Sequence, residues 1–395
     1  MFYAHTLFIA GLCATLSSAV TIDMEGLPDT GLNTSSWVTG VAPPLDDMYD
    51  LNDLQIAAKN TLLPASYAEY RTGALNELTY QANLNIWDYI KLNGFTFQDV
   101  SDLNLNTTIL GYNFSLPFFI APAANAGLAN STSAELGLVQ AAGDAGMLYV
   151  PSISSTKSIE QIADARVSPD QVMFHQEYVW SNKSRLRNEL QRIEDAGFKV
   201  IFLTVDNTGI NGIRTRSIRY TGEETDPGHS ATFTIKSINE IRNMTSLPIV
   251  PKGIKTWQDA KTCLDLGFEA IYVSNHGGRV LDGAPTSVEV LLDIRKNAPE
   301  VFEKMEVYAD GGVRRANHVI TLLALGARAV GLGRSAMFSN LYGAEGVARM
   351  IYLLQTELGT TMKLMGQSDV TKIVGNSTFI NTKLVESQYF GVSSS

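Results

Sequence analysis

The chain has 395 residues, of which 45% are hydrophobic, and a formal net charge of -10 at pH 7. This length and composition allow a sizeable core, in one large barrel or two ordinary domains. The negative charge argues against a nucleic acid partner.

Residues 1–19 are interpreted as a secretory signal peptide. An apolar run from Thr6 to Leu16 is followed by Ser17-Ser18-Ala19, a small-residue cleavage site. The alternative is a buried N-terminal helix. The run is too short to span a membrane, and no later stretch is long enough, so we expect no membrane anchor.

Asparagines in Asn-x-Ser/Thr sequons are more frequent than chance predicts, which favours a secreted glycoprotein. They are Asn33, Asn106, Asn113, Asn130, Asn182, Asn243 and Asn376. Removing the leader, which contains Cys13, would leave Cys263 as the single cysteine, so no internal disulfide is expected. Cys263 lies in a helical pattern, where packing is a better interpretation than nucleophilic chemistry.

Residues 20–49 form an expected N-terminal arm, because they are polar, acidic and interrupted by Pro43-Pro44. Residues 50–395 form the expected folded domain. It begins with a helical segment from Asp50 to Tyr70, capped by Asp50 or Asn52 and interrupted or ended at Pro64.

Short apolar runs alternate with helical segments beyond Leu116. In the segment Arg185 to Gly197, for example, Leu186, Leu190 and Ile193 share one helical face. The expected strands are 117–122, 147–150, 172–175, 200–206, 248–252, 270–274, 306–310 and 329–333. Eight such units over about 250 residues predict an α/β fold, a closed (β/α)8 TIM barrel with an N-terminal helical extension. An open doubly wound sheet is the alternative, weakened because no Gly-x-Gly-x-x-Gly follows the first strand.

Polar residues gather where these strands end, which is the edge where such barrels carry their chemistry. His276 can take a proton near neutral pH, and Asp206 can orient it and favour its charged form. Lys252 can form a Schiff base or stabilise negative charge on a cofactor ring. Arg214 and Arg279 can clamp an anionic substrate. Each of these side chains could instead have only a structural role at the barrel rim.

Glycines and arginines follow the last two strands, in Asp310-Gly311-Gly312-Val313-Arg314 and Gly331-Leu332-Gly333-Arg334. Barrels commonly hold a phosphate at this position, so a phosphorylated ligand is expected. Two glycine-rich turns with solvated arginines are the alternative.

The string Ser274-Asn-His-Gly-Gly-Arg-x-Leu-Asp-Gly-Ala-Pro285, with Thr204-Val205-Asp206, Lys252-Gly253 and the two glycine–arginine motifs, resembles the FMN-dependent α-hydroxy acid oxidases and dehydrogenases. This family includes glycolate oxidase, lactate oxidase and the flavin domain of flavocytochrome b2. The resemblance covers residues from about Asp50 to Gly366.

The resemblance implies a role for each matching residue. His276 would be the catalytic base, Asp206 its partner, and Lys252 would lie beside the flavin ring. Arg279, Arg214, Tyr178 and Tyr70 would bind the substrate. The residues implied to bind FMN are Ala123, Ser152, Gln176, Thr204, Lys252, Ser274, Asp310, Gly312, Arg314, Gly333 and Arg334. No metal is implied.

Several positions depart from the family pattern. The family usually has a tyrosine about four residues before Gly73-Ala74, and Tyr70 is one residue short of that spacing. Many members have a pocket tryptophan where this chain has Ser154, and the first strand ends in Ala121-Pro122-Ala123-Ala124-Asn125. The segment from Tyr220 to Thr234, which corresponds to the family's lid, is short and polar.

The leading expectation is a secreted oxidase that converts a 2-hydroxy acid to the 2-oxo acid and passes electrons from FMN to dioxygen, forming hydrogen peroxide. The alternatives are an FMN-dependent dehydrogenase with another acceptor, a tailoring oxidase with an atypical substrate, and a flavin-binding protein without turnover. Expected partners are the small-molecule substrate and dioxygen, and the resemblance implies a homotetramer.

Overall fold

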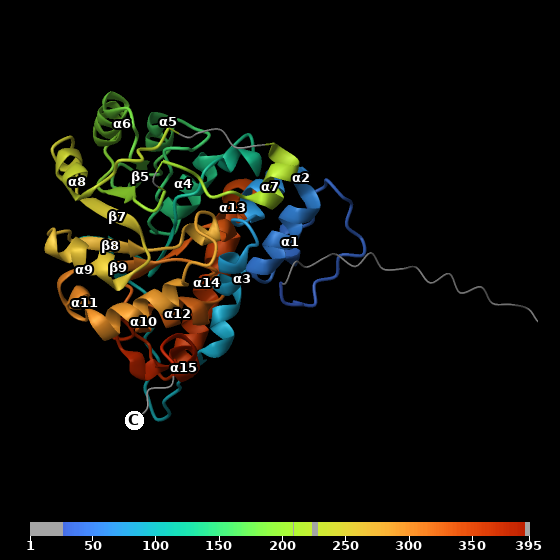
Figure 1. Ribbon diagram of the computed structural model, residues 1–395. Coiled ribbons are helices and arrows are strands. Elements are labelled where there is room, and N and C mark those ends of the chain that lie inside the picture. The colour runs from blue at the N-terminus through green and yellow to red at the C-terminus, as the bar shows by residue number, and fades with distance from the viewer. Residues whose placement is uncertain (1–26, 208, 223–227, 392–395) are drawn as a thin grey trace, which may run out of the picture.

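The computed structural model describes residues 27–207, 209–222 and 228–391 (Figure 1). The predicted signal peptide lies outside the described residues. The predicted helical segment is two helices, α1 (Leu51–Thr61) and α2 (Pro64–Arg71), followed by α3 (Leu78–Asn85). Asp50 caps α1 by accepting hydrogen bonds from the N–H groups of Asn52 and Asp53. Pro64 occupies the first turn of α2, where its missing N–H costs nothing, so the helix breaks where the sequence predicts.

Within the described residues, seven parallel strands form one curled sheet in the order β4-β10-β9-β8-β7-β6-β5. Their bounds are β4 (Phe118–Ile120), β5 (His175–Tyr178), β6 (Ile201–Thr204), β7 (Ile249–Ile254), β8 (Ala270–Val273), β9 (Glu306–Ala309) and β10 (Ala329–Leu332). The eighth predicted strand, 147–150, is replaced by isolated parallel bridges that link Tyr149 to Ile120 and to Met173. These bridges close the gap between β4 and β5, as the predicted barrel requires.

The third predicted strand is displaced along the chain. It was expected at 172–175, but β5 begins at His175 and runs through Gln176 and Glu177 to Tyr178. An apolar run is a poor guide here, because the polar side chains of Gln176 and Glu177 are themselves buried. Gln176 and Tyr178 therefore lie within the strand rather than after it.

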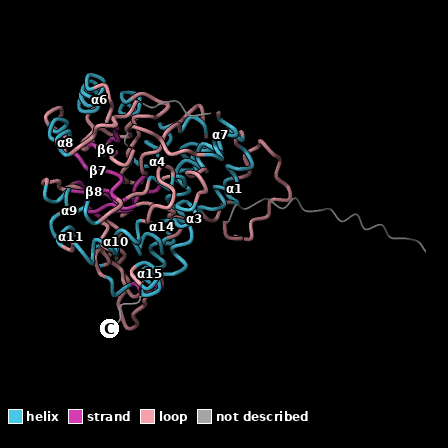
Figure 2. Tube along the Cα trace, in the orientation of Figure 1, coloured by secondary structure: helices cyan, strands magenta, loops and turns pink. Residues whose placement is uncertain are grey.

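Helices surround the sheet, as the cyan segments around the magenta strands show (Figure 2). Their bounds are α4 (Glu135–Asp144), α5 (Ile159–Asp164), α6 (Lys183–Asp195), α7 (Thr215–Thr221), α8 (Ile235–Arg242), α9 (Trp257–Asp265), α10 (Ser287–Asn297), α11 (Glu300–Lys304), α12 (Ala316–Ala324), α13 (Arg334–Ser339), α14 (Gly343–Leu364) and α15 (Lys383–Tyr389). In α6 the buried residues are Leu186, Leu190 and Ile193, the face that the sequence predicts. Two antiparallel pairs, β1 (Lys91–Leu92) with β11 (Ile380–Asn381) and β2 (Thr107–Ile109) with β3 (Tyr112–Phe114), lie outside the curled sheet.

The inside of the curled sheet is packed solid. Phe119, Phe202, Tyr272 and Tyr308 are fully buried there and form mainly edge-to-face ring contacts. A Cβ on Gly331 would lie 2.0 Å from the hydroxyl of Tyr272, so glycine is required to admit that ring. The barrel is a core rather than a channel, and ligand space is confined to its rim.

The N-terminal helices form a wall beside the barrel. Helix α1 packs on α13, α2 packs on α7, and α3 packs on the turn at His276–Gly278. Figure 1 shows these blue helices gathered on one side of the molecule. The wall places α2 and α3 next to the loops that follow the strands. Among the described helices, none is both long and apolar enough to cross a bilayer.

Cys263 lies buried in α9. Burial raises the pKa of its thiol to about 12, so the nucleophilic thiolate is disfavoured. This agrees with the interpretation of Cys263 as a packing residue.

Candidate active site

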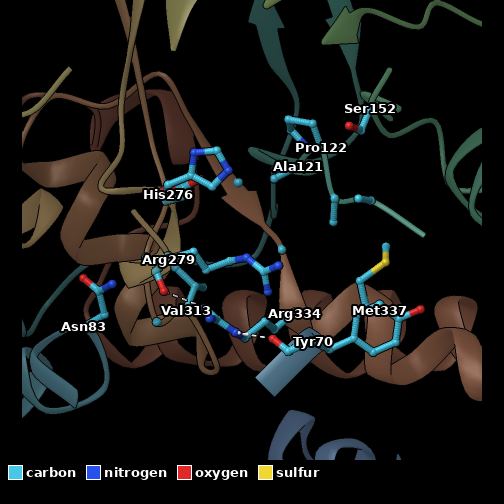
Figure 3. A pocket seen from close by; sticks show the side chains of 18 of the residues that line it. Tyr70, Asn83, Ala121, Pro122, Ser152, His276, Arg279, Val313, Arg334 and Met337 are labelled. Carbon is cyan, nitrogen blue, oxygen red and sulfur yellow. Dashed lines mark hydrogen bonds between the residues drawn. The ribbon is translucent and has the colours of Figure 1, made fainter. Parts of the chain in front are cut away.

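A cavity with about 1120 Å³ of empty volume, including its open mouth, lies at the carboxyl ends of the strands. Most of the predicted site residues line it: Tyr70, Ala123, Ser152, Gln176, Tyr178, Thr204, Lys252, His276, Arg279, Asp310, Gly312, Arg314, Gly333 and Arg334. Asp206, Arg214 and Ser274 lie behind this layer, each hydrogen-bonded to a residue that lines the cavity. Figure 3 shows His276 and Ser152 on opposite sides of the cavity, with Arg279 below His276 and Arg334 hydrogen-bonded next to Tyr70.

His276 and Asp206 form the predicted pair. The imidazole Nδ1 lies 3.0 Å from the Asp206 carboxylate, which is fully buried, while the imidazole is 21% exposed. Burial by itself would raise the pKa of Asp206, but His276, Lys252 and Lys255 lower it to about 2. Asp206 is therefore ionised at neutral pH and holds the imidazole with its other nitrogen available to the cavity.

The backbone around this pair is strained or tightly packed. His276 has φ of 59°, in the left-handed region that a non-glycine residue seldom adopts. A Cβ on Gly253 would lie 2.5 Å from the Asp206 side chain, so that glycine admits the carboxylate. Such features persist where the surrounding structure fixes them, as at functional sites.

Polar side chains form two short hydrogen-bonded groups beside one another along this edge of the sheet. Ser152 donates to the Gln176 amide oxygen at 2.7 Å, and the Gln176 amide nitrogen donates to the Thr204 hydroxyl at 2.9 Å. Lys252 donates a hydrogen bond to the Ser274 hydroxyl at 3.3 Å, and that hydroxyl also accepts a hydrogen bond from the backbone N–H of His276. These two groups can hold the polar edge of a planar ring, with the Lys252 ammonium beside it.

The other end of the cavity is suited to an anion. The Nε of Arg314 and an oxygen of Asp310 are buried with no hydrogen-bond partner among the described residues. A Cβ on Gly333 would meet nothing within 4 Å, so the cavity reaches the backbone there. These groups fit a phosphate held by Arg314, with a neighbouring hydroxylated chain on Asp310.

Arg334 lies in the same part of the cavity and also braces the wall. Its guanidinium donates to the carbonyls of Tyr70, Thr72 and Gly277. Burial and then the nearby charges of Arg279, Arg314 and Arg71 lower its pKa to about 9. A cluster of buried guanidiniums favours an anionic ligand, which would offset their mutual repulsion.

Arg214 and Arg279 come together as predicted, but a carboxylate of the chain itself lies between them. Glu69 accepts a hydrogen bond from Arg279 at 3.0 Å and one from Arg214 at 2.9 Å. Its backbone carbonyl accepts a further hydrogen bond from each guanidinium, at 2.6 and 3.1 Å. Glu69 was not among the residues predicted from the sequence to form the site.

Tyr70 lines the cavity, but its hydroxyl is directed away from the arginines. It donates to the Asn125 carbonyl at 2.7 Å and accepts the Ala129 N–H at 3.1 Å. The spacing noted in the sequence contained the signal for Glu69. The fourth residue before Gly73, where the family's tyrosine is expected, is Glu69 rather than Tyr70.

Tyr178, the other predicted tyrosine, lies at the end of β5 and lines the cavity. Its ring stacks on His229, with centroids 4.2 Å apart. Burial, followed by the charge of Asp206, raises the pKa of Tyr178, so its hydroxyl keeps its proton and can donate to a ligand oxygen.

Comparisons with known proteins agree with this geometry. The family model described as FMN-dependent dehydrogenase matches residues 58–228 and 221–381. L-lactate oxidase of Nostoc sp. is 34% identical over 367 residues, covering 85% of this chain and 98% of the relative. L-lactate dehydrogenase (cytochrome) of Saccharomyces cerevisiae is 31% identical over 359 residues, covering 84% of this chain and 60% of the relative.

The solved flavin-binding domain of baker's yeast flavocytochrome b2 superimposes with a TM-score of 0.83 at 30% identity, covering 89% of this chain and 91% of that one. The chain thus spans about three fifths of the yeast dehydrogenase but nearly all of the solved flavin domain. With a family model that matches most of its length and a site that fits the cofactor, the chain belongs to the FMN-dependent dehydrogenase family.

Proposed function

We propose that this protein is an FMN-dependent oxidase that converts the CH–OH group of a 2-hydroxy acid, or of a derivative of one, to a carbonyl group, with dioxygen as the final acceptor. The observation that carries the proposal is the His276–Asp206 pair, which faces the same cavity as Lys252 and Arg279. A base, a cation and an anion-binding end share one space, as the removal of a proton next to a flavin requires.

Bound FMN supplies the two-electron acceptor. Its phosphate would be held by Arg314 and Arg334, and its ring edge by Lys252 with Gln176 and Thr204. In the proposed reaction, the free nitrogen of His276 takes the proton from the substrate α-carbon, and the ionised Asp206 stabilises the resulting imidazolium.

The overall reaction balances. The substrate loses two electrons and two protons and becomes the 2-oxo compound, and dioxygen takes up both pairs to become hydrogen peroxide. The L-lactate oxidase of Nostoc sp. supports dioxygen as the acceptor. The yeast relative named L-lactate dehydrogenase (cytochrome) is the basis for the competing assignment, a dehydrogenase with another acceptor.

The experiment is an anaerobic absorbance titration of the purified holoenzyme with a panel of 2-hydroxy acids, esters and amides, followed by admission of oxygen and peroxide assay. We expect bleaching of the flavin by one class of compound, then recovery with stoichiometric peroxide. Bleaching with no recovery in air would support another electron acceptor. A stable flavin that no compound bleaches would contradict the proposed reaction.

We also propose export and glycosylation. Of the sequon asparagines, Asn33, Asn106, Asn113, Asn182 and Asn243 are exposed, while Asn130 and Asn376 are half-buried. Export predicts a mature protein that begins near Val20, and a mass that falls on enzymatic removal of N-glycans. A tetramer is expected from the resemblance, and light scattering of the purified protein tests it.

A further inference from the structure

Glu69 occupies the place where two arginines would otherwise be available to a substrate anion. One carboxylate oxygen pairs with Arg279 and the other with Arg214, and both guanidiniums also donate to the Glu69 carbonyl. A single residue of α2 thus takes two hydrogen bonds from each member of the pair. The charge that a substrate carboxylate would supply is already present in the protein.

This carboxylate is ionised and partly buried. Burial by itself would raise the pKa of Glu69, but Arg279 and Arg214 lower it below its ordinary value. The Glu69 side chain is 18% exposed, and those of Arg214 and Arg279 are 8% and 26% exposed. Like charges brought close together repel strongly in such a site. A second carboxylate beside Glu69 is therefore disfavoured.

The two residues that follow Glu69 in the chain are held in place by buried contacts. The Tyr70 hydroxyl donates a hydrogen bond to the Asn125 carbonyl and accepts one from the Ala129 N–H. The Tyr70 carbonyl accepts a hydrogen bond from Arg334. Arg71 forms an ion pair with Glu77 at 3.1 Å in which both side chains are less than 10% exposed. Glu69 is consequently part of a rigid wall and not of a loop that could swing aside.

We propose that Glu69 sets the substrate class, so that the enzyme oxidises 2-hydroxy esters or amides, with an uncharged acyl group, in preference to free 2-hydroxy acids. This inference rests on the proposed function. A neutral carbonyl oxygen can still accept from Arg279 and Tyr178, which line the cavity, without facing a net repulsion from Glu69. The ester or amide bond is not cleaved, and the electrons and protons leave the CH–OH group as in the reaction above.

The acyl group also affects the proton transfer to His276. In a free acid the carboxylate charge resists the build-up of further negative charge on the α-carbon. The carbonyl of an ester or amide carries no such charge and accepts that electron density more readily. A neutral substrate therefore makes the α-proton easier to remove, which suits a site whose arginine charge is already neutralised.

The first test compares matched pairs in anaerobic stopped-flow reduction of the holoenzyme flavin: (S)-lactate with its methyl ester, and (S)-mandelate with its methyl ester and amide. In the wild type we expect the neutral member to be favoured by about 100-fold in reduction efficiency, because like-charge juxtaposition costs several kcal/mol. Glu69→Gln should remove most of this preference, mainly by improving the free acids.

Glu160→Gln is the matched control. Glu160 also binds an arginine through both oxygens, at 2.8 Å each to Arg192, but on the surface of α5 and away from the cavity. In Glu160→Gln, the ratio of the flavin reduction efficiency with the ester to that with the acid should equal the ratio in the wild type. If Glu69→Gln fails to fold or to hold flavin, Glu69→Tyr, which restores the family's usual residue, takes its place.

A second readout does not depend on turnover. Calorimetric binding of oxamate and of its ethyl ester to the oxidised holoenzyme should show the ester bound by the wild type, and oxamate bound well only after Glu69→Gln. Equal or stronger binding of oxamate by the wild type, or an ester-to-acid ratio that Glu69→Gln leaves unchanged, would overturn the inference. If no compound reduces the flavin, the proposed function fails, and calorimetry still decides the role of Glu69.

Discussion

Two regions of the cavity differ in how closely they follow the family pattern. The rim of the barrel, at the ends of β5 to β10, supplies His276, Asp206, Lys252 and Arg314, and each lies where the motifs predict. The N-terminal wall supplies Glu69 where the family usually has a tyrosine. If the proposed function and the proposed role of Glu69 hold, the redox machinery and the choice of substrate are built by different segments.

The physical reason lies in how each region is fixed. Strand ends are held by the ladder of parallel hydrogen bonds and by the aromatic core beneath them, so side chains there keep one geometry. The wall is a set of short helices packed from outside. One substitution on α2 can change the charge that the substrate meets while the rim stays unaltered.

The largest expected effect comes from the rim. Replacing His276 with Gln should slow flavin reduction by about 10²- to 10⁴-fold, because the general base is lost. The bound flavin spectrum should stay unchanged, because His276 is not among the residues assigned to hold the cofactor. The Glu160→Gln protein serves as the reference for folding. Stopped-flow reduction measures the rate. A rate within a few-fold of the wild type would show that the base lies elsewhere.

The next effect concerns the phosphate end. Arg314→Met should weaken FMN binding by about 10- to 100-fold, because charged hydrogen bonds contribute roughly 1.5–3 kcal/mol. Fluorescence titration of the apoprotein with FMN measures this. Arg315→Met is the neighbouring control, because Arg315 pairs with Asp50 and Glu357 and does not line the cavity. Equal losses in both variants would argue against the phosphate site.

Acid should destabilise the fold by protonating two buried histidines. Burial lowers the pKa values of His175 and His318 to about 3, and His318 stacks on Trp87 of the N-terminal segment at 4.3 Å. A histidine whose pKa is lowered by folding contributes full stability above about pH 6.5, and loses it as the pH falls toward 3. Each of the two histidines should lower the free energy of unfolding by about 1.4 kcal/mol for every pH unit in that window.

Urea unfolding between pH 7 and pH 5 tests this expectation. His175→Leu should reduce the pH dependence of the free energy of unfolding by the contribution of one histidine. A free energy of unfolding that does not change across this range would show that neither histidine is held neutral.

The smallest effect compares helix caps in the two regions. Asp50→Ala on α1 and Asn182→Ala on α6 should each lower the free energy of unfolding by about 1 kcal/mol. Only the former should also weaken FMN binding slightly, because Gln55 of α1 accepts a hydrogen bond from Arg314. The variants should be produced in bacteria, so that Asn182→Ala removes only the helix cap and not a glycan as well. Identical FMN affinities would show that α1 does not support the phosphate end.

The sequence by itself determined the barrel and most of the site. Apolar runs and helical periodicity are local signals, and parallel strands bring their carboxyl ends together. The pairing of His276 with Asp206, and the placing of Lys252 and Arg314 at one rim, could therefore be predicted. The fold departs from prediction at 147–150, which forms bridges only, and at β5, whose strand contains buried polar residues.

Only the tertiary structure decided which side chain of α2 meets the arginines. Glu69 and Tyr70 are adjacent in sequence, but a helix directs neighbouring side chains about 100° apart, so one faces the arginines and the other faces Asn125 and Ala129. That rotation is set by contacts with distant segments, including Arg334 and Arg214. Such contacts join residues far apart in the chain, so the four-residue spacing to Gly73 could point to Glu69 but could not show which groups it binds.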